Sequence, residues 1–445
     1  MQEWLTKPAA DQGRAIAAGE IDARELTEAY LDAITAHPER DEIYARTTPD
    51  RARAEAASAA ERAAAGTPAG PLDGVPISWK DLYDVAGVGC EGGTRLLKGR
   101  VAETDCTVVA RGTAAGTVCL GKTHTTELAF SGLGVNPMTA TCPNAIEPAR
   151  APGGSSSGAA VSTKLGLAAL GIGSDTGGSV RIPAAWNDLV GLKTTAGRIP
   201  TDGVIALSRT YDTVGPLTRT VEDAVLMYAI LADIDVPDWS GGALSDETFH
   251  VAETAVLDGL DDGVGAALEA ALAKLSAAGA RITRGPTPEF AAVFETMRTV
   301  SPIVTSEAWA EWGDVIEANP GTMWAPIESR FRQGKGADAE TDRQALAEME
   351  AHSASLQQRI ADNGLIVLPT SPCFPPETAK LLADEAYFTE RNLLALRNTR
   401  LGNLLTLSSV TIPSGTPMCG LMLFAPSGDE ARLLSIGRAI EKVLG

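Results

Sequence analysis

The chain has 445 residues, of which 44% are hydrophobic and 21% charged, as in a globular protein with a large core. Its formal net charge of −20 argues against nucleic acid or an anionic membrane as a partner, because both attract basic surfaces. No apolar run reaches the roughly 18 residues that a transmembrane helix needs.

The six cysteines and the first residues of the chain indicate the compartment. None of the cysteines belongs to a C-x-x-C pair, which argues against a zinc site. Residues 1–5 lack the basic start and the apolar core of a signal peptide. We therefore expect a cytoplasmic protein whose cysteines are reduced, small buried residues.

The first 66 residues have the pattern of helices. Asp22 is a suitable N-cap, Glu25 would complete a capping box, and an apolar stripe follows. Residues 51–65 are rich in alanine, glutamate and arginine and end at Gly66, a typical helix stop.

From about residue 72 to 214 the pattern changes. Short β-branched runs separated by glycine, such as 75–79 and 116–121, alternate with small-residue helical stretches such as 159–166. Strands that alternate with helices in this way indicate an α/β sheet covered on both faces.

Beyond residue 222 the chain is again mostly helical. Strand-like runs occur at 365–368 and 420–424, and a helix over 429–443 closes the chain. We expect a single domain over residues 1–445, with an N-terminal helical segment 1–66 and a variable helical insertion at about 235–360.

One lysine and two glycine–serine clusters carry the chemistry of this sequence. Ser179 directly follows two glycines, Ser155 lies in the cluster 152–158, and Lys80 closes the apolar run 75–79. A serine beside bare backbone amides can attack a carbonyl while the N–H groups hold the oxygen that becomes negative. These residues indicate acyl transfer without histidine.

Other serine chemistries fit the sequence less well. Residues 154–158 match the G-x-S-x-G elbow with Ser156 as nucleophile, but the downstream histidines, His250 and His352, lie in polar, helix-like surroundings typical of a surface. No serine is followed three residues later by lysine, and no phosphate-binding P-loop motif occurs.

Lys80 is the natural base for Ser179. A free lysine keeps its proton up to a pH of about 10.4. Burial in an apolar wall, with serine hydroxyls donating to the neutral amine, would lower its pKa and let it take a proton and later return it to a leaving amine. The competing interpretation is a surface lysine paired with Asp81.

Arg181 has two open interpretations. It could bind a substrate carboxylate through its guanidinium fork, or it could hold Asp175 in place. Asp175 itself is expected to accept hydrogen bonds that shape the loop, because an inward-pointing carboxylate would repel a developing oxyanion.

Between about residues 71 and 223 the sequence resembles the amidase signature family. The motifs that carry the resemblance lie at residues 74–81, 121–123, 152–158, 173–185, 191–193 and 212–223. The resemblance continues more weakly at 368–370 and 403–420. It implies a single α/β/α domain with a large, mixed, twisted central sheet covered by helices on both faces, and neither metal nor organic cofactor.

The resemblance also implies a Ser–cis-Ser–Lys triad. Ser179 would be the nucleophile that forms an acyl-enzyme, Ser155 the bridging serine after a cis peptide bond, and Lys80 the general base and acid.

The resemblance places the rest of the site around this triad. The oxyanion hole falls on the backbone amides of Thr176, Gly177, Gly178 and Ser179. The acyl side of the substrate pocket falls near Ala129 and Ser131.

The implied function is hydrolysis of a small-molecule amide carbon–nitrogen bond, with release of ammonia or an amine. Two alternatives within the family are the glutaminase-type A subunit of a tRNA-dependent amidotransferase and a narrow hydrolase of carboxylated amides or ureas of the malonamide, allophanate or carboxybiuret type. A third is a binding protein that has kept the fold without activity. The run 134–137 looks more like that of free-standing amidases. We expect neither nucleic acid nor membrane as partner, and a homodimer is compatible with the sequence.

The sequence departs from the usual family pattern at 186–188 and 194–196, behind the nucleophile, where the changes could reshape the pocket. Trp309, Trp312 and Trp324 could form the roof of the pocket or pack in the core.

Overall fold

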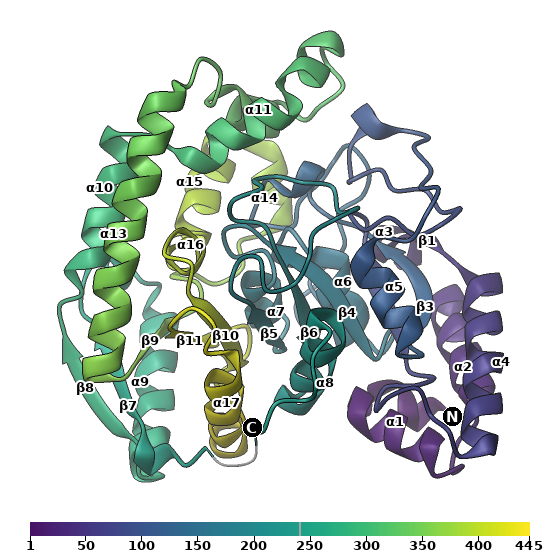
Figure 1. The fold of residues 1–445 in the computed structure, drawn as a ribbon. Helices are drawn as coiled ribbons and strands as arrows, with labels where there is room; N and C mark the ends of the chain where they lie inside the picture. The colour runs from purple at the N-terminus through teal and green to yellow at the C-terminus, as the bar shows by residue number, and fades with distance from the viewer. Residues whose placement is uncertain (240–241) are drawn as a thin grey trace.

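A computed structural model describes residues 1–239 and 242–445 and contains one mixed sheet of eleven strands (Figure 1). In spatial order the strands are β1 (Tyr44–Thr47), β3 (Val118–Thr123), β2 (Pro76–Lys80), β4 (Leu170–Asp175), β6 (Thr213–Thr218), β5 (Val190–Lys193), β10 (Ser408–Pro413), β11 (Gly420–Ala425), β9 (Leu365–Pro369), β7 (Thr248–Ala252) and β8 (Arg281–Gly285). Strand β2 pairs in parallel with β3 and β4, and β7 in parallel with β8 and β9. The remaining neighbours are antiparallel, so the sheet is mixed, as the family resemblance implies.

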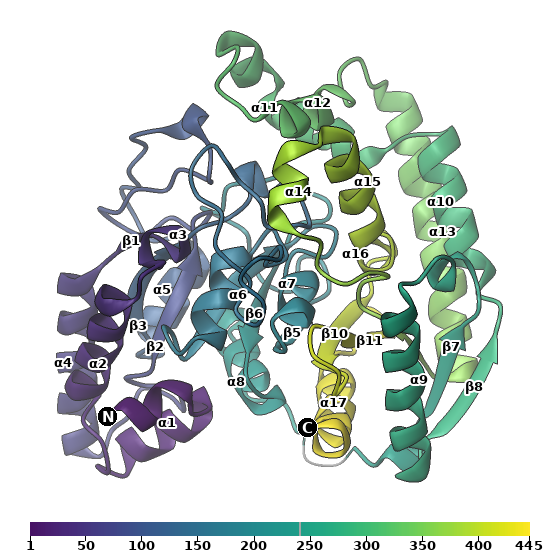
Figure 2. The same cartoon turned by 180° about the vertical axis from the view of Figure 1, so that it is seen from behind.

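Helices cover both faces of this sheet, as the two opposite views show (Figures 1 and 2). In chain order they are α1 (Ala9–Ala17), α2 (Ala23–Ala36), α3 (Arg40–Ile43), α4 (Pro49–Ala65), α5 (Thr107–Ala114), α6 (Ser157–Lys164), α7 (Arg181–Trp186), α8 (Val221–Ala232), α9 (Asp262–Ala277), α10 (Pro288–Thr299), α11 (Ile303–Ala318), α12 (Ala325–Arg332), α13 (Ala339–Asn363), α14 (Thr378–Ala383), α15 (Glu385–Ala395), α16 (Thr399–Leu404) and α17 (Glu430–Leu444). The prediction of an α/β fold with a helix-covered central sheet is therefore confirmed.

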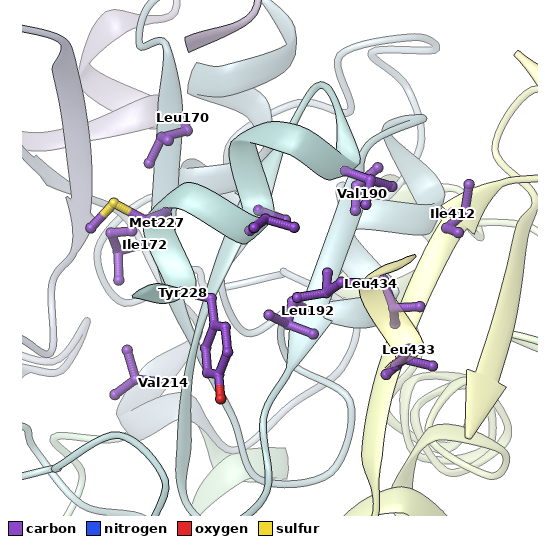
Figure 3. Packing of buried hydrophobic residues seen from close by; sticks show 14 of the residues in the cluster. Leu170, Ile172, Val190, Leu192, Val214, Met227, Tyr228, Ile412, Leu433 and Leu434 are labelled. Atoms are coloured by element: carbon purple, nitrogen blue, oxygen red, sulfur yellow. The ribbon is translucent and has the colours of Figure 1, made fainter. Parts of the chain in front are cut away.

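The core lies between the sheet and the helices, and Figure 3 shows its packing where α8 and α17 meet the central strands. The labelled side chains come from β4, β5, β6, β10 and these two helices: Leu170, Ile172, Val190, Leu192, Val214, Met227, Tyr228, Ile412, Leu433 and Leu434. Each is at most 2% exposed. Full burial of one such side chain contributes about 1.5–3 kcal/mol, so this packing holds the strands that carry the site.

Several elements agree with the sequence patterns. The Asp22 carboxylate caps α2 by accepting from the Arg24 amide, and Gly66 ends α4 in a left-handed conformation with φ of 69°. The predicted strands at 365–368 and 420–424 are β9 and β11, and the closing helix is α17.

The variable helical insertion expected at about 235–360 also contains two strands, β7 and β8, which extend the main sheet. Strand β8 is a short edge strand without a fully buried residue, and its polar sequence offers no apolar run to detect. His250 accordingly lies on β7 and is only 9% exposed, not on a helical surface. Residues 240 and 241, within the same segment, lie outside the described residues.

All six cysteines are buried and unpaired, as expected. Within residues 1–239 and 242–445, no helix combines the length and apolar character required to cross a bilayer.

Candidate active site

Lys80 ends strand β2, the third strand of the sheet from the β1 edge, and is completely buried. Its Nζ donates to Ser155 Oγ at 2.6 Å and to Ser174 Oγ at 2.9 Å. Strand β2 thus positions the Lys80 amine between two serine hydroxyls that come from different segments of the chain.

Burial lowers the pKa of Lys80 to about 7, although the charges of Asp175 and Asp212 act in the opposite direction. The alternative partner, Asp81, is bound to Arg46 at 2.9 Å and to Lys122 at 3.1 Å. The interpretation of Lys80 as a surface lysine paired with Asp81 is therefore wrong.

Ser155 lies on the loop before α6, and its peptide bond with Gly154 is cis, as the resemblance implies. A Cβ at position 154 would lie only 2.6 Å from Gly134 N. This close approach of two backbone segments requires glycine at position 154.

Ser179 lies on the loop between β4 and α7 and is 4% exposed. Among the described residues no group is hydrogen-bonded to its Oγ, so Ser155 and Ser179 are not joined by a hydrogen bond in this conformation. Ser179 lines a cavity of about 300 Å³.

The amides around Ser179 divide into two sets. Gly178 N donates to Asp175 Oδ1 at 2.7 Å and Val180 N to Asp175 Oδ2 at 3.0 Å. The expected contribution of the Gly178 amide to an oxyanion hole is therefore wrong, because this donor is already bound to a carboxylate. The amides of Thr176, Gly177 and Ser179 have no acceptor in the described part of the chain.

Asp175 and Arg181 form a buried ion pair that shapes this loop. Arg181 Nη2 lies 2.9 Å from Asp175 Oδ1 and Nε lies 3.0 Å from Oδ2, and both side chains are fully buried. Burial alone would raise the pKa of Asp175, but the charge and hydrogen bonds of Arg181 hold it well below its usual value. Asn403 donates to Asp175 Oδ1 at 2.9 Å and accepts from Arg181 Nη2 at 2.6 Å.

Of the two interpretations of Arg181, the structure therefore supports the structural one. Its side chain does not line the cavity, and Nη1 contacts Met422 Sδ at 3.4 Å. The assignment of Arg181 as a substrate-binding residue was wrong, because Asp175 uses the guanidinium fork.

Replacing Arg181 with methionine is expected to lower the free energy of unfolding by about 3–5 kcal/mol, because it leaves a buried carboxylate without its cation. Urea titration measures this loss. The control is Arg209→Met, which removes a surface ion pair with Glu311 and should cost less than about 1 kcal/mol. Equal losses in the two variants would show that the Asp175–Arg181 pair does not stabilise the fold.

The cavity beside Ser179 lies between the loop that carries this serine and a group of helices. Ala129 and Ser131 line it, together with Thr176 and Gly177. The other side is formed mainly by residues of α12, α15 and α16, which Figure 2 shows beyond the ends of β10 and β11. Ser131 Oγ donates to Asn392 Oδ1 of α15 at 3.1 Å.

Core packing is the role of the three tryptophans. Trp309, Trp312 and Trp324 are absent from the cavity lining and pack against the cluster that contains Phe331 and Phe388. The unusual residues at 186–188 also stay outside the cavity, where Asn187 donates to two backbone carbonyls.

Ser156, the nucleophile of the elbow alternative, is completely buried. Its Oγ donates to Ser174 O at 3.2 Å and accepts from Ser174 N at 3.3 Å. It does not line the cavity. The elbow interpretation is therefore not supported.

Several polar side chains at this site were not predicted from the sequence. Ser174 and Asp212 lie within motifs of the family resemblance, but the motifs alone do not show their contacts. Thr176 donates to Asp212 at 2.5 Å, and burial raises the pKa of Asp212 to about 6. Arg330 and Arg400 line the cavity from α12 and α16, and no motif connects them to Ser179.

The comparison with protein families agrees with this site. The family model named Amidase matches residues 25–434, and the chain belongs to the amidase family.

Two relatives illustrate the range of this family. The chain is 35% identical over 441 residues to 2-amino-5-chloromuconic acid deaminase of Comamonas testosteroni, covering 96% of this chain and 95% of that protein. It is 31% identical over 481 residues to the A subunit of glutamyl-tRNA(Gln) amidotransferase from Chloroflexus aggregans, covering 99% of this chain and 96% of that protein.

Solved structures agree with the same conclusion. A crystal structure described as an amidase matches with a TM-score of 0.87 and 28% identity, over 99% of this chain and 100% of the other. The peptide amidase PAM in complex with the competitive inhibitor chymostatin matches with a TM-score of 0.86 and 25% identity, over 99% and 98%. The protein is thus an enzyme with the fold of amide carbon–nitrogen hydrolases.

Proposed function

We propose that this protein hydrolyses the amide bond of a small molecule through an acyl-enzyme formed on Ser179. The observation that carries the proposal is the buried Lys80 amine, 2.6 Å from Ser155 Oγ, beside a cavity lined by Ser179. A lysine with a pKa near 7 is present in substantial part as the neutral amine at neutral pH and can accept a proton.

In the first half-reaction, Ser179 Oγ attacks the carbonyl carbon of the amide. Its proton passes to Ser155, and Ser155 gives its own proton to Lys80 Nζ. The carbonyl oxygen becomes negative and is stabilised by the unpaired amides of Thr176, Gly177 and Ser179. For this transfer the Ser179 side chain turns towards Ser155.

The tetrahedral intermediate then collapses. The carbon–nitrogen bond breaks, and the proton on Lys80 returns through Ser155 to the departing nitrogen, which leaves as ammonia or an amine. In the second half-reaction, water gives a proton to the same relay and attacks the ester carbon, and Ser179 recovers its proton as the acid leaves.

An ammonia-release screen over small monoamides, diamides, ureas and carboxyl-bearing amides tests this proposal. Labelling with a fluorophosphonate, followed by peptide mapping, reports independently on the reactivity of Ser179. We expect Ser179 to be labelled and at least one amide class to release ammonia. Labelling at another serine would contradict the assigned nucleophile.

The relative from Comamonas testosteroni, named as a deaminase, supports ammonia as the leaving group. A second candidate function is that of the glutaminase-type component of a tRNA-dependent amidotransferase, since several relatives carry that enzyme's name. Copurification with a second polypeptide, together with glutaminase activity that depends on tRNA, would favour the second candidate. Amide turnover by the isolated chain favours the first.

A further inference from the structure

Two arginines in the cavity beside Ser179 have no carboxylate partner among the residues that the structure describes. Arg330 of α12 and Arg400 of α16 both line the cavity. Arg400 donates from Nε and Nη2 to the backbone carbonyls of Leu396 and Leu393, each at 3.1 Å. In the described ranges, no Asp or Glu oxygen lies within 4.0 Å of either guanidinium.

Arg330 is the less satisfied of the two. Its Nη1 is shielded from solvent and has no hydrogen-bond partner among the described residues. Its guanidinium carbon lies 4.5 Å from the ring centroid of Phe130, which also lines the cavity. A shielded N–H donor without an acceptor costs free energy, and a ligand oxygen would remove that cost.

The balance of charge in the cavity is positive, although the whole chain carries a formal charge of −20. Among the lining residues, the single carboxylate is Glu385, which is exposed at the start of α15. Burial and the charge of Arg400 lower the pKa of Arg330 to about 9, and burial and the charge of Arg397 lower that of Arg400 to about 10. Both arginines therefore stay charged at neutral pH and repel each other.

Other arginines of this protein show the contrast. Arg51 is bound to Asp105 through two nitrogens at 2.7 and 2.8 Å, and Arg100 is bound to Asp84 in the same way at 2.6 and 2.8 Å. Bidentate pairing of this kind is the usual way in which a guanidinium is satisfied. Among the described residues Arg330 forms no such pair, and Arg400 uses Nε and Nη2 for backbone carbonyls, which leaves its Nη1 for a ligand in the cavity that Ser179 also lines.

We propose that the substrate is an amide that carries a carboxylate, and that Arg330 and Arg400 bind this carboxylate while Ser179 attacks the amide carbonyl. This inference rests on the proposed amide hydrolysis and names its substrate class. Arg181, which lies two residues after Ser179 in the sequence, cannot do the same because its guanidinium is bound to Asp175. A cavity of about 300 Å³ is at the lower end of small-ligand pockets, so the substrate is small.

The test compares matched amides. The monoamides of succinic, glutaric and adipic acid carry a carboxylate, and their neutral twins are the corresponding unsubstituted aliphatic amides. For at least one pair we expect the wild-type kcat/KM to favour the carboxylate by about tenfold to a hundredfold or more, as charge-assisted hydrogen bonds do. A preference for the neutral twin in every pair would overturn the proposal.

The variants Arg330→Met and Arg400→Met test whether these two arginines cause the preference for the carboxylate-bearing amide. Each is expected to lower kcat/KM for the carboxylate by at least about tenfold and to leave the neutral twin within about threefold. The matched control is Arg332→Met on the same helix, because Arg332 is bound to Glu328 and does not line the cavity. Equal losses on both twins, or an equal loss in the control, would contradict the assigned role.

Protection of Ser179 from fluorophosphonate labelling gives a second readout that needs no turnover. Succinate, glutarate or adipate should slow labelling of the wild type and the Arg332→Met control but not of Arg330→Met, and the matching diamides should have little effect. Thermal melts show whether each variant is folded, and Arg330→Lys keeps the charge if the methionine variant is not. Failure of Ser179 to be labelled at all rejects the proposed function. Labelling without protection rejects only the carboxylate site.

Discussion

Replacement of Ser179 with alanine is expected to lower amide turnover by roughly a thousandfold or more, while the protein stays folded. The reason is local. Ser179 Oγ borders the cavity and forms no hydrogen bond with the described residues, so its loss removes the nucleophile without breaking a contact. Ammonia release measures the first effect, and urea unfolding should show a stability within about 0.5 kcal/mol of the wild type.

The matched control is Ser329→Ala, which removes an exposed hydroxyl from the opposite side of the same cavity. This variant should keep most of its activity, because nothing places Ser329 beside Lys80. Retention of more than about 1% of wild-type turnover by Ser179→Ala would mean that another group attacks the substrate.

The second large effect concerns Lys80 and pH. The neutral amine accepts the proton, so kcat/KM is expected to rise with pH and to level off above a pH of about 7, the pKa that burial gives Lys80. Below that pH the protonated amine has no free electron pair, and activity falls about tenfold per pH unit. Lys80→Met should lower turnover by roughly a thousandfold or more at every pH.

A second buried lysine makes this prediction specific. The pKa of Lys193 is also lowered to about 7 by burial, but its Nζ donates to the backbone carbonyls of Thr194 and Leu407 and it does not line the cavity. The inflection near pH 7 should therefore survive in Lys193→Met. If the inflection disappeared in Lys193→Met and Lys80→Met kept near-normal activity, the titrating group would be Lys193 and the role assigned to Lys80 would be wrong.

Much of the site could be predicted from the sequence because its chemistry is concentrated in short motifs. Lys80 ends an apolar run that becomes a buried strand, and the glycines before Ser155 allow a close approach of two backbone segments. Local pattern therefore predicted that a buried lysine would meet a serine, and the structure shows this contact at 2.6 Å.

The features of the site and fold that the sequence did not predict depend on contacts between distant parts of the chain, which a short motif does not contain. The glycine-rich sequence around Gly178 suggests a free backbone N–H group, but in the structure this N–H donates to the Asp175 carboxylate. Arg181 stands next to the nucleophile, whereas Arg330 and Arg400, far away along the chain, are the arginines that reach the cavity. Strand β8 was missed because an exposed edge strand needs no apolar run.

Helix α16 forms hydrogen bonds with the loop that carries Ser179 and also lines the cavity. Thr399 donates to the Gly177 carbonyl at 2.7 Å and Asn403 to the Asp175 carboxylate at 2.9 Å, while Arg400 faces the cavity from the same six-residue helix. Laboratory evolution towards a new acyl group is therefore expected to disturb reactivity when it changes Thr399 or Asn403 of α16. Within the described ranges, helix α12 forms no such hydrogen bond with the loop, so diversity introduced around Arg330 is the safer route to altered selectivity.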